Sequence, residues 1–196
     1  MSHQELLTEV EDHVNTLFKE HKNDSLAYHN IEHTRKVVQH ANEIGTFYQL
    51  DEESLFILSA AAWFHDVGYL FTGTKDHERT GVEIMKEFFS NKNLPSNVTD
   101  NIERCIMATK KLAHPIHLLE RILCDADTYH FGTPEFKKTD SLVRKEIELQ
   151  SGSTPMGWAA RTITMLRNHK FQTAYCNDRL SSGKEENIRW LESMTQ

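Results

Sequence analysis

The chain has little cysteine, proline or glycine, and each shortage excludes a class of structure. Its 196 residues include only 4 prolines and 8 glycines, too few for the many tight turns of an all-β architecture. The three cysteines, Cys105, Cys124 and Cys176, form an odd number without Cys-x-x-Cys spacing. That pattern disfavours a secreted disulfide framework and favours a reducing, cytoplasmic environment.

Positive charge and long apolar runs are also scarce. The 22 basic residues stand against 29 acidic ones, for a net charge of −7. A broad nucleic-acid-binding face needs clustered Lys and Arg, so this balance disfavours one but leaves room for a small phosphorylated ligand. The most apolar run, residues 55–64, is too short to span a bilayer, and the polar N-terminus does not resemble a signal peptide. We expect a soluble protein that binds neither nucleic-acid polymers nor membranes.

Apolar residues recur at helical spacing along the chain, and no segment alternates with the period of a strand. Ser2 and Glu5 form a capping box, and Asn30 and Asp51 are suited to cap the second and third helices. Residues 55–64 are apolar on nearly all sides, which is typical of a central helix. The predicted fold class is all-α.

The C-terminal third predicts further helices. Residues 134–150 form an amphipathic, well-charged segment, and Pro155 suits the first turn of a long helix reaching towards Asp178. The Ser-Gly pair at 182–183 predicts a turn before a short last helix. With no repeat, low-complexity stretch or linker, the chain predicts a single domain over residues 1–196. The apolar stripes of the first and last helices could pack inward or against a second copy, so a homodimer is left open.

Four polar residues fall on the apolar stripes of three of these helices, where they face the predicted core. They are His33, His65, Asp66 and Asp127. Burying an aspartate without a partner is costly, and Asp66 lies at a helix C-terminus, where the dipole is already negative. A divalent metal held by two imidazoles and two carboxylates would satisfy all four. The alternative is an ordinary hydrogen-bonded His65–Asp66 pair, with Asp127 a helix-end residue.

Three blocks surround these residues: Tyr-His-Asn-Ile-Glu-His-Thr from 28, Ala-Ala-Trp-Phe-His-Asp-Val-Gly-Tyr from 61, and Ile-Leu-Cys-Asp-Ala-Asp from 122. In this order they resemble the H…HD…D pattern of the HD superfamily of metal-dependent phosphohydrolases. The resemblance covers residues 28–132 and implies a helical HD domain on which residues 134–194 pack. It implies His33, His65, Asp66 and Asp127 as metal ligands. Asp125 offers a second carboxylate, but the family pattern favours Asp127.

The resemblance also implies a function, the hydrolysis of a phosphoester of a small metabolite, with a nucleotide as the expected class. A water activated by one divalent metal would attack phosphorus, and Mn, Fe, Co, Ni, Zn and Mg are all open as that metal. Asp66, Glu78 and Lys110 are the expected catalytic residues, Glu78 as general acid or base and Lys110 as a cation for the phosphate. The alternative for Glu78 is that it only stabilises the start of a helix through the helix dipole. The alternative for Lys110 is that it is a solvated surface charge without a catalytic role. Weaker cationic candidates are Arg35, Lys36 and Arg121.

Two further histidines leave other functions open. His77 and His114 lie between the HD pair and Asp127, in the order in which some HD proteins ligate a second metal. A two-iron centre of that kind acts as an oxygenase, which is the first alternative. The second is a non-catalytic domain that senses a nucleotide. The simpler interpretation of both histidines is that they lie near helix termini without a ligand role, and one metal per chain is favoured.

Overall fold

The computed structural model describes residues 2–110 and 113–195, and every regular element in this part of the chain is helical. The all-α prediction is therefore confirmed. The described residues pack into two compact units. The N-terminal unit holds the chain up to residue 23 and residues 29–127, and the C-terminal unit holds residues 24–28 and those from 128 onward. The single domain over residues 1–196 stays a prediction.

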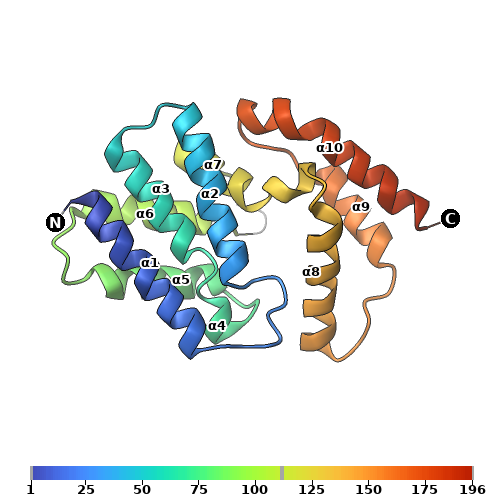
Figure 1. The fold of residues 1–196 in the computed structure, drawn as a ribbon, viewed down its shortest axis with the longest axis horizontal. Coiled ribbons are helices and arrows are strands. Elements are labelled where there is room, and N and C mark those ends of the chain that lie inside the picture. The colour runs from blue at the N-terminus through green and yellow to red at the C-terminus, as the bar shows by residue number, and fades with distance from the viewer. Residues whose placement is uncertain (1, 111–112, 196) are drawn as a thin grey trace. The chain divides into compact units, whose positions relative to one another are not determined.

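The N-terminal unit is built around one buried helix, α3, which contacts α1, α2, α5, α6 and α7 (Figure 1). Every residue of α3 from 56 to 64 is buried, which confirms the predicted central helix. The helices of this unit are α1 (His3–Glu20), α2 (Ile31–Phe47), α3 (Glu52–Phe64), α4 (Tyr69–Thr72), α5 (His77–Phe89), α6 (Ser96–Ala108) and α7 (Leu118–Asp127).

The predicted helix caps of this unit are all present. Ser2 and Glu5 form the capping box of α1. The Asn30 side chain accepts hydrogen bonds from the first turn of α2, and the Asp51 side chain accepts one from Ser54 N at the start of α3. Among the described residues, one helical stretch, Glu52–Thr72, could cross a membrane by length and composition, but 78% of its apolar window is buried inside the protein. Such burial is typical of the core helix of a soluble protein.

The C-terminal unit contains the short 3-10 helix η1 (Tyr129–Gly132), α8 (Phe136–Ser151), α9 (Trp158–Asn168) and α10 (Ala174–Ser193). The predicted helix from Pro155 to Asp178 is wrong, because the chain leaves the helical conformation at His169. A new helix then begins at Thr173, whose side chain accepts a hydrogen bond from Cys176 N.

The predicted turn at residues 182–183 is also wrong, because Gly183 lies inside α10. A Cβ atom at Gly183 would lie 2.0 Å from the carbonyl oxygen of Gly132. Glycine is therefore needed at this position for the close contact between α10 and η1, rather than for the conformation of a turn.

Candidate metal centre

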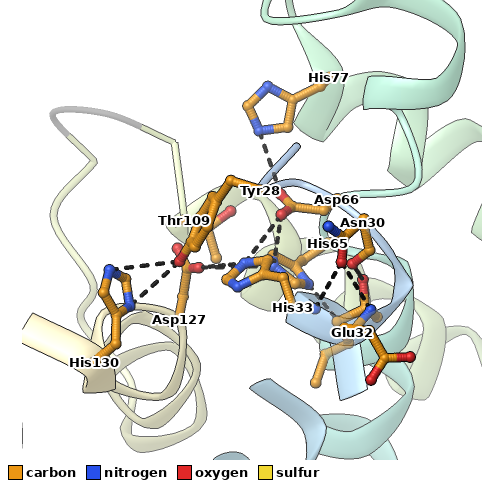
Figure 2. Close-up of polar contacts among 12 residues, drawn as sticks. Tyr28, Asn30, Glu32, His33, His65, Asp66, His77, Thr109, Asp127 and His130 are labelled. Atoms are coloured by element: carbon orange, nitrogen blue, oxygen red, sulfur yellow. Dashed lines mark hydrogen bonds and ion pairs between the residues drawn. The ribbon is translucent and has the colours of Figure 1, made fainter. Parts of the chain in front are cut away.

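Three helices of the N-terminal unit end or begin at the centre that the sequence predicts (Figure 2). His33 lies in the first turn of α2, where its backbone N–H donates to the capping side chain of Asn30 at 3.3 Å. His65 follows the last residue of α3, Asp66 comes next, and Asp127 is the last residue of α7. The caps and lengths of these helices therefore determine where the four side chains lie.

Two imidazoles and two carboxylates converge in this centre. Nε2 of His33 lies 3.2 Å from Asp66 Oδ2 and 3.1 Å from Asp127 Oδ1. Nε2 of His65 lies 3.2 Å from Asp66 Oδ2 and 3.8 Å from Asp127 Oδ1. Neighbouring ligand atoms around one ion with bonds of about 2.1 Å are separated by about 3.0 Å in an octahedron and about 3.4 Å in a tetrahedron. Three of the four measured separations fall between these two values, and the fourth, from His65 Nε2 to Asp127 Oδ1, is longer at 3.8 Å.

The hydrogen bonding of these side chains also fits a metal. Nδ1 of His65 lies 2.7 Å from the carbonyl oxygen of Ala62, so Nδ1–H donates there and the lone pair of Nε2 faces the carboxylates. In the described part of the chain, His65 Nε2 and Asp66 Oδ2 are buried without a hydrogen bond. Buried acceptors that face one another are unfavourable unless a cation lies between them. Among the described residues, the ligand atoms of His33, His65 and Asp127 all lie within 4.8 Å of one another, close enough to hold a metal ion; Asp66, which contacts both imidazoles, is proposed as the fourth ligand.

The pKa values of the metal-free centre also show that positive charge is favoured there. Burial is the largest influence on the pKa of His33 and lowers it, but the carboxylates of Asp127 and Asp66 beside its ring together raise that pKa to about 9. Burial also opposes protonation of His65, yet the Asp66 charge leaves its pKa raised. Burial favours the neutral form of Asp66, but His65 and His33 hold the Asp66 pKa well below its usual value. The fold thus keeps negative charge buried beside two imidazoles.

A third histidine lies beside the other oxygen of Asp66. Nε2 of His77, at the start of α5, is 3.7 Å from Asp66 Oδ1 and 3.5 Å from Oε1 of the buried Glu78. The backbone of His77 packs directly against residue 68, and this contact is possible because residue 68 is glycine. A Cβ at Gly68 would lie 1.9 Å from the His77 carbonyl oxygen.

Tyr69 was given no role from the sequence, although it closes the His-Asp-Val-Gly-Tyr block. Its buried ring lies between two imidazoles, 4.0 Å from the ring centre of His29 and 4.0 Å from that of His77. The place of Tyr69 in the block was the only available signal, because ring stacking between residues far apart in the chain has no sequence pattern.

Other predicted site residues lie in different surroundings. Lys110 Nζ donates to Asp76 Oδ1 at 2.8 Å, and this hydrogen bond raises the exposed lysine's pKa. Arg35 is held by Glu32 at 2.7 Å. His114 is exposed, and no contact joins it to His77 or to the four converging residues within the described ranges. The functional roles of these side chains stay predictions.

Comparison with known proteins agrees with this geometry. The family model for the HD domain matches residues 30–132, which is more than half of the chain. No curated protein and no solved structure matches the chain. The matched range contains all four converging residues, His33, His65, Asp66 and Asp127, and the described elements within it are helical. The chain belongs to the HD domain family.

Proposed function

We propose that the protein is a metal-dependent phosphohydrolase that hydrolyses a phosphoester of a small metabolite, with a nucleotide as the expected substrate class. Metal-dependent phosphohydrolysis is the general activity of the HD superfamily. The observation that carries the proposal is the convergence of His33, His65, Asp66 and Asp127, with buried acceptor atoms that a cation would satisfy. A divalent metal held there supplies Lewis-acid charge that polarises a water molecule and a phosphoryl oxygen. Mn, Fe, Co, Ni, Zn and Mg all stay open as its identity.

The residues of the chain have separate tasks in this proposal. His33 and His65 present Nε2 to the metal, and the Ala62 carbonyl oxygen fixes the orientation of the His65 ring. Glu78 is buried beside His77, whose Nε2 also lies beside Oδ1 of Asp66. Its carboxylate Oε1 can accept a proton from the attacking water or return one to the leaving group.

Lys110 is proposed to bind a substrate phosphate at the rim of the site. It already binds an anion, because its ammonium group donates to Asp76, the residue that precedes His77. A phosphate can replace the Asp76 carboxylate as the acceptor, since both are anionic oxygen groups that form charge-assisted hydrogen bonds.

The expected partners and location follow from composition. An excess of acidic residues favours a small ligand over a nucleic-acid polymer or an anionic membrane surface. Three free cysteines are consistent with the cytoplasm. The apolar faces of α1 and α10 are buried within the single chain, so a homodimer, which stays a prediction, would use other parts of the surface. The first alternative, a two-iron oxygenase, requires His114 as a metal ligand. The second, a nucleotide-sensing domain, requires a centre that does not catalyse hydrolysis. No specific observation in the described residues favours either.

Elemental analysis on protein purified without chelator or metal-affinity resin tests the proposal. We expect about one divalent metal per chain, the occupancy of a single four-ligand site. His65→Ala and Asp127→Asn should lose it, whereas a control at an exposed histidine, His117→Ala, should keep it. Hydrolysis of nucleotides and model phosphoesters should require the metal and follow its occupancy. Hydrolysis that persists in the Asp127→Asn variant, or metal-loaded protein inactive on a broad phosphoester panel, would contradict the proposal.

A further inference from the structure

The C-terminal unit contains a groove whose lining includes none of the proposed metal ligands. Its volume is about 580 Å³, and it is bounded by α8, the start of α9 and the end of α10. Small-molecule sites usually measure roughly 300–1,000 Å³ and combine apolar walls with a few polar groups. The groove has this size and this kind of lining.

One wall of the groove is a face of α8. The residues of α8 that line it are spaced i, i+3, i+4 and i+7, so they lie on one side of the helix. They are Lys137, Asp140, Ser141 and Arg144. The other walls contribute two half-buried indoles, from Trp158 at the start of α9 and Trp190 near the end of α10. The groove therefore combines aromatic surface with charged groups from a single helix.

The Asp140 carboxylate accepts a hydrogen bond from the indole of Trp158. Both of its carboxylate oxygens lie 3.0 Å from Nε1 of Trp158. Burial raises the Asp140 pKa, and hydrogen bonds from Trp158 and Thr162 oppose that shift. The carboxylate therefore holds the Trp158 ring in place and is already engaged by donors of the chain.

Lys137, in contrast, is a cation without a carboxylate partner among residues 2–110 and 113–195. Its Nζ lies 5.2 Å from the ring centroid of Trp190, and no carboxylate in the described chain forms an ion pair with it. The other cation of the groove, Arg144, is paired with Glu148 at 3.1 Å. Within the described part of the chain, the groove thus presents the Lys137 ammonium group beside an aromatic face, with no ion pair to a carboxylate.

We propose that this groove binds a small planar aromatic anion, with its ring against the indoles of Trp158 and Trp190 and its anionic group at Lys137. Offset or edge-to-face contact with an indole stabilises an aromatic ring, and an ammonium group forms charge-assisted hydrogen bonds with carboxylate, sulfonate or phosphate oxygens. An organic cation would meet Lys137 and a carboxylate that is already hydrogen-bonded. The site is independent of the metal centre and of the proposed hydrolysis.

The test uses the fluorescent probe 1-anilinonaphthalene-8-sulfonate, an anion with a planar naphthalene ring, titrated into the full chain before and after chelator treatment. Lys137→Glu should weaken probe binding about tenfold or more, the equivalent of roughly 1.4 kcal/mol. Lys138→Glu makes the same charge change at the next residue of α8, outside the groove lining, and should change binding by no more than about twofold. N-phenyl-1-naphthylamine, which lacks the sulfonate, should bind more weakly and be insensitive to Lys137→Glu.

A second variant tests the location without changing charge. Ser141→Trp places a large side chain at an exposed position that lines the groove, and it should abolish probe binding while circular dichroism and the melting temperature show an intact fold. Equal probe affinity in the two lysine variants would overturn the proposal. So would equal binding of the neutral probe, or probe binding that chelator abolishes, because that result would place the probe at the metal centre.

Discussion

At the scale of single residues, the two carboxylate oxygens of Asp66 face different groups of the metal centre. Oδ2 lies 3.2 Å from the Nε2 atoms of both His33 and His65. Oδ1 instead lies 3.7 Å from Nε2 of His77, which in turn neighbours Glu78. A carboxylate shared in this way allows the metal ligands and the proposed acid–base group to be tested separately.

Replacing Glu78 with glutamine should remove hydrolysis without removing the metal. Glutamine preserves the size of the side chain but cannot exchange a proton, so kcat should fall by roughly 10²-fold or more, the usual contribution of general acid–base catalysis. Metal content and kcat are measured on the same preparation. Glu83→Gln, an exposed change on the same helix, serves as the control. Loss of metal in the Glu78→Gln variant would instead place Glu78 among the ligands.

Metal uptake should depend on pH through His33. In the metal-free protein the pKa of His33 is raised to about 9, so protonated His33 stabilises the fold. This stabilisation is fully present below the ordinary value of 6.5 and is lost as pH rises through about 9. Because a ligating imidazole must be neutral, metal binding near pH 7.5 should release about one proton or more from the imidazoles, and release should cease well above pH 9.

Calorimetric titration of the chelator-treated protein in two buffers with different ionisation enthalpies counts these protons directly. Metal binding at pH 7.5 that releases none would show that neutral imidazoles already stand in the metal-free centre, and it would contradict the prediction.

At the scale of elements, the C-terminal unit shows where helical propensity and packing disagree. Glycine weakens a helix, so Gly183 looks like a helix end when only its neighbours in the sequence are considered. In the structure it is an interior residue of α10, and a side chain there would overlap the Gly132 carbonyl oxygen. The contact between α10 and η1 therefore outweighs the local preference of the chain.

Gly183→Ala should consequently destabilise the protein, although alanine favours an isolated helix by about 1 kcal/mol relative to glycine. We expect the free energy of unfolding to fall by about 1–3 kcal/mol, the usual cost of overpacking, as measured by urea denaturation. Ser182→Ala, one position earlier in α10, provides the matched control and should be nearly neutral. A Gly183→Ala variant more stable than the parent chain would show that α10 and η1 do not pack this closely.

At the scale of the whole molecule, all four proposed metal ligands belong to the N-terminal unit. They come from two helices of that unit, α2 and α7, and from the two residues that follow α3. A metal that binds only the folded arrangement must therefore stabilise this unit. Trp63 of α3 lies within it, whereas Trp158 and Trp190 belong to the C-terminal unit.

A chain in which Trp63 is the only tryptophan, made with Trp158→Phe and Trp190→Phe, should report this stabilisation by fluorescence. At a free metal concentration of about 100 times Kd, the free energy of unfolding should rise by about 2.7 kcal/mol relative to chelator-treated protein. Adding Asp127→Asn should remove the increase. An unchanged Trp63 transition in the metal-loaded chain would contradict a metal centre in the N-terminal unit.

Local patterns were enough to predict the first three helices of the N-terminal unit and their caps. Asn30 and Asp51 cap helices through groups only two or three residues away, and apolar periodicity identified α3 as the central helix. The same periodicity turned His33, His65, Asp66 and Asp127 inward. Burial of such groups is unfavourable without a shared partner, which is why these four residues could be selected from the sequence as candidate metal ligands.

Only the tertiary structure decided the features that depend on contacts between distant residues. The break between α9 and α10, the place of Gly183 inside a helix and the Tyr69 ring between His29 and His77 have no local signature. Likewise, the residues of the groove come from three separate helices of the C-terminal unit. The sequence by itself determined which side chains had to be buried, because burial follows from helical period. Which of them meet depends on the packing of helices that lie far apart in the chain.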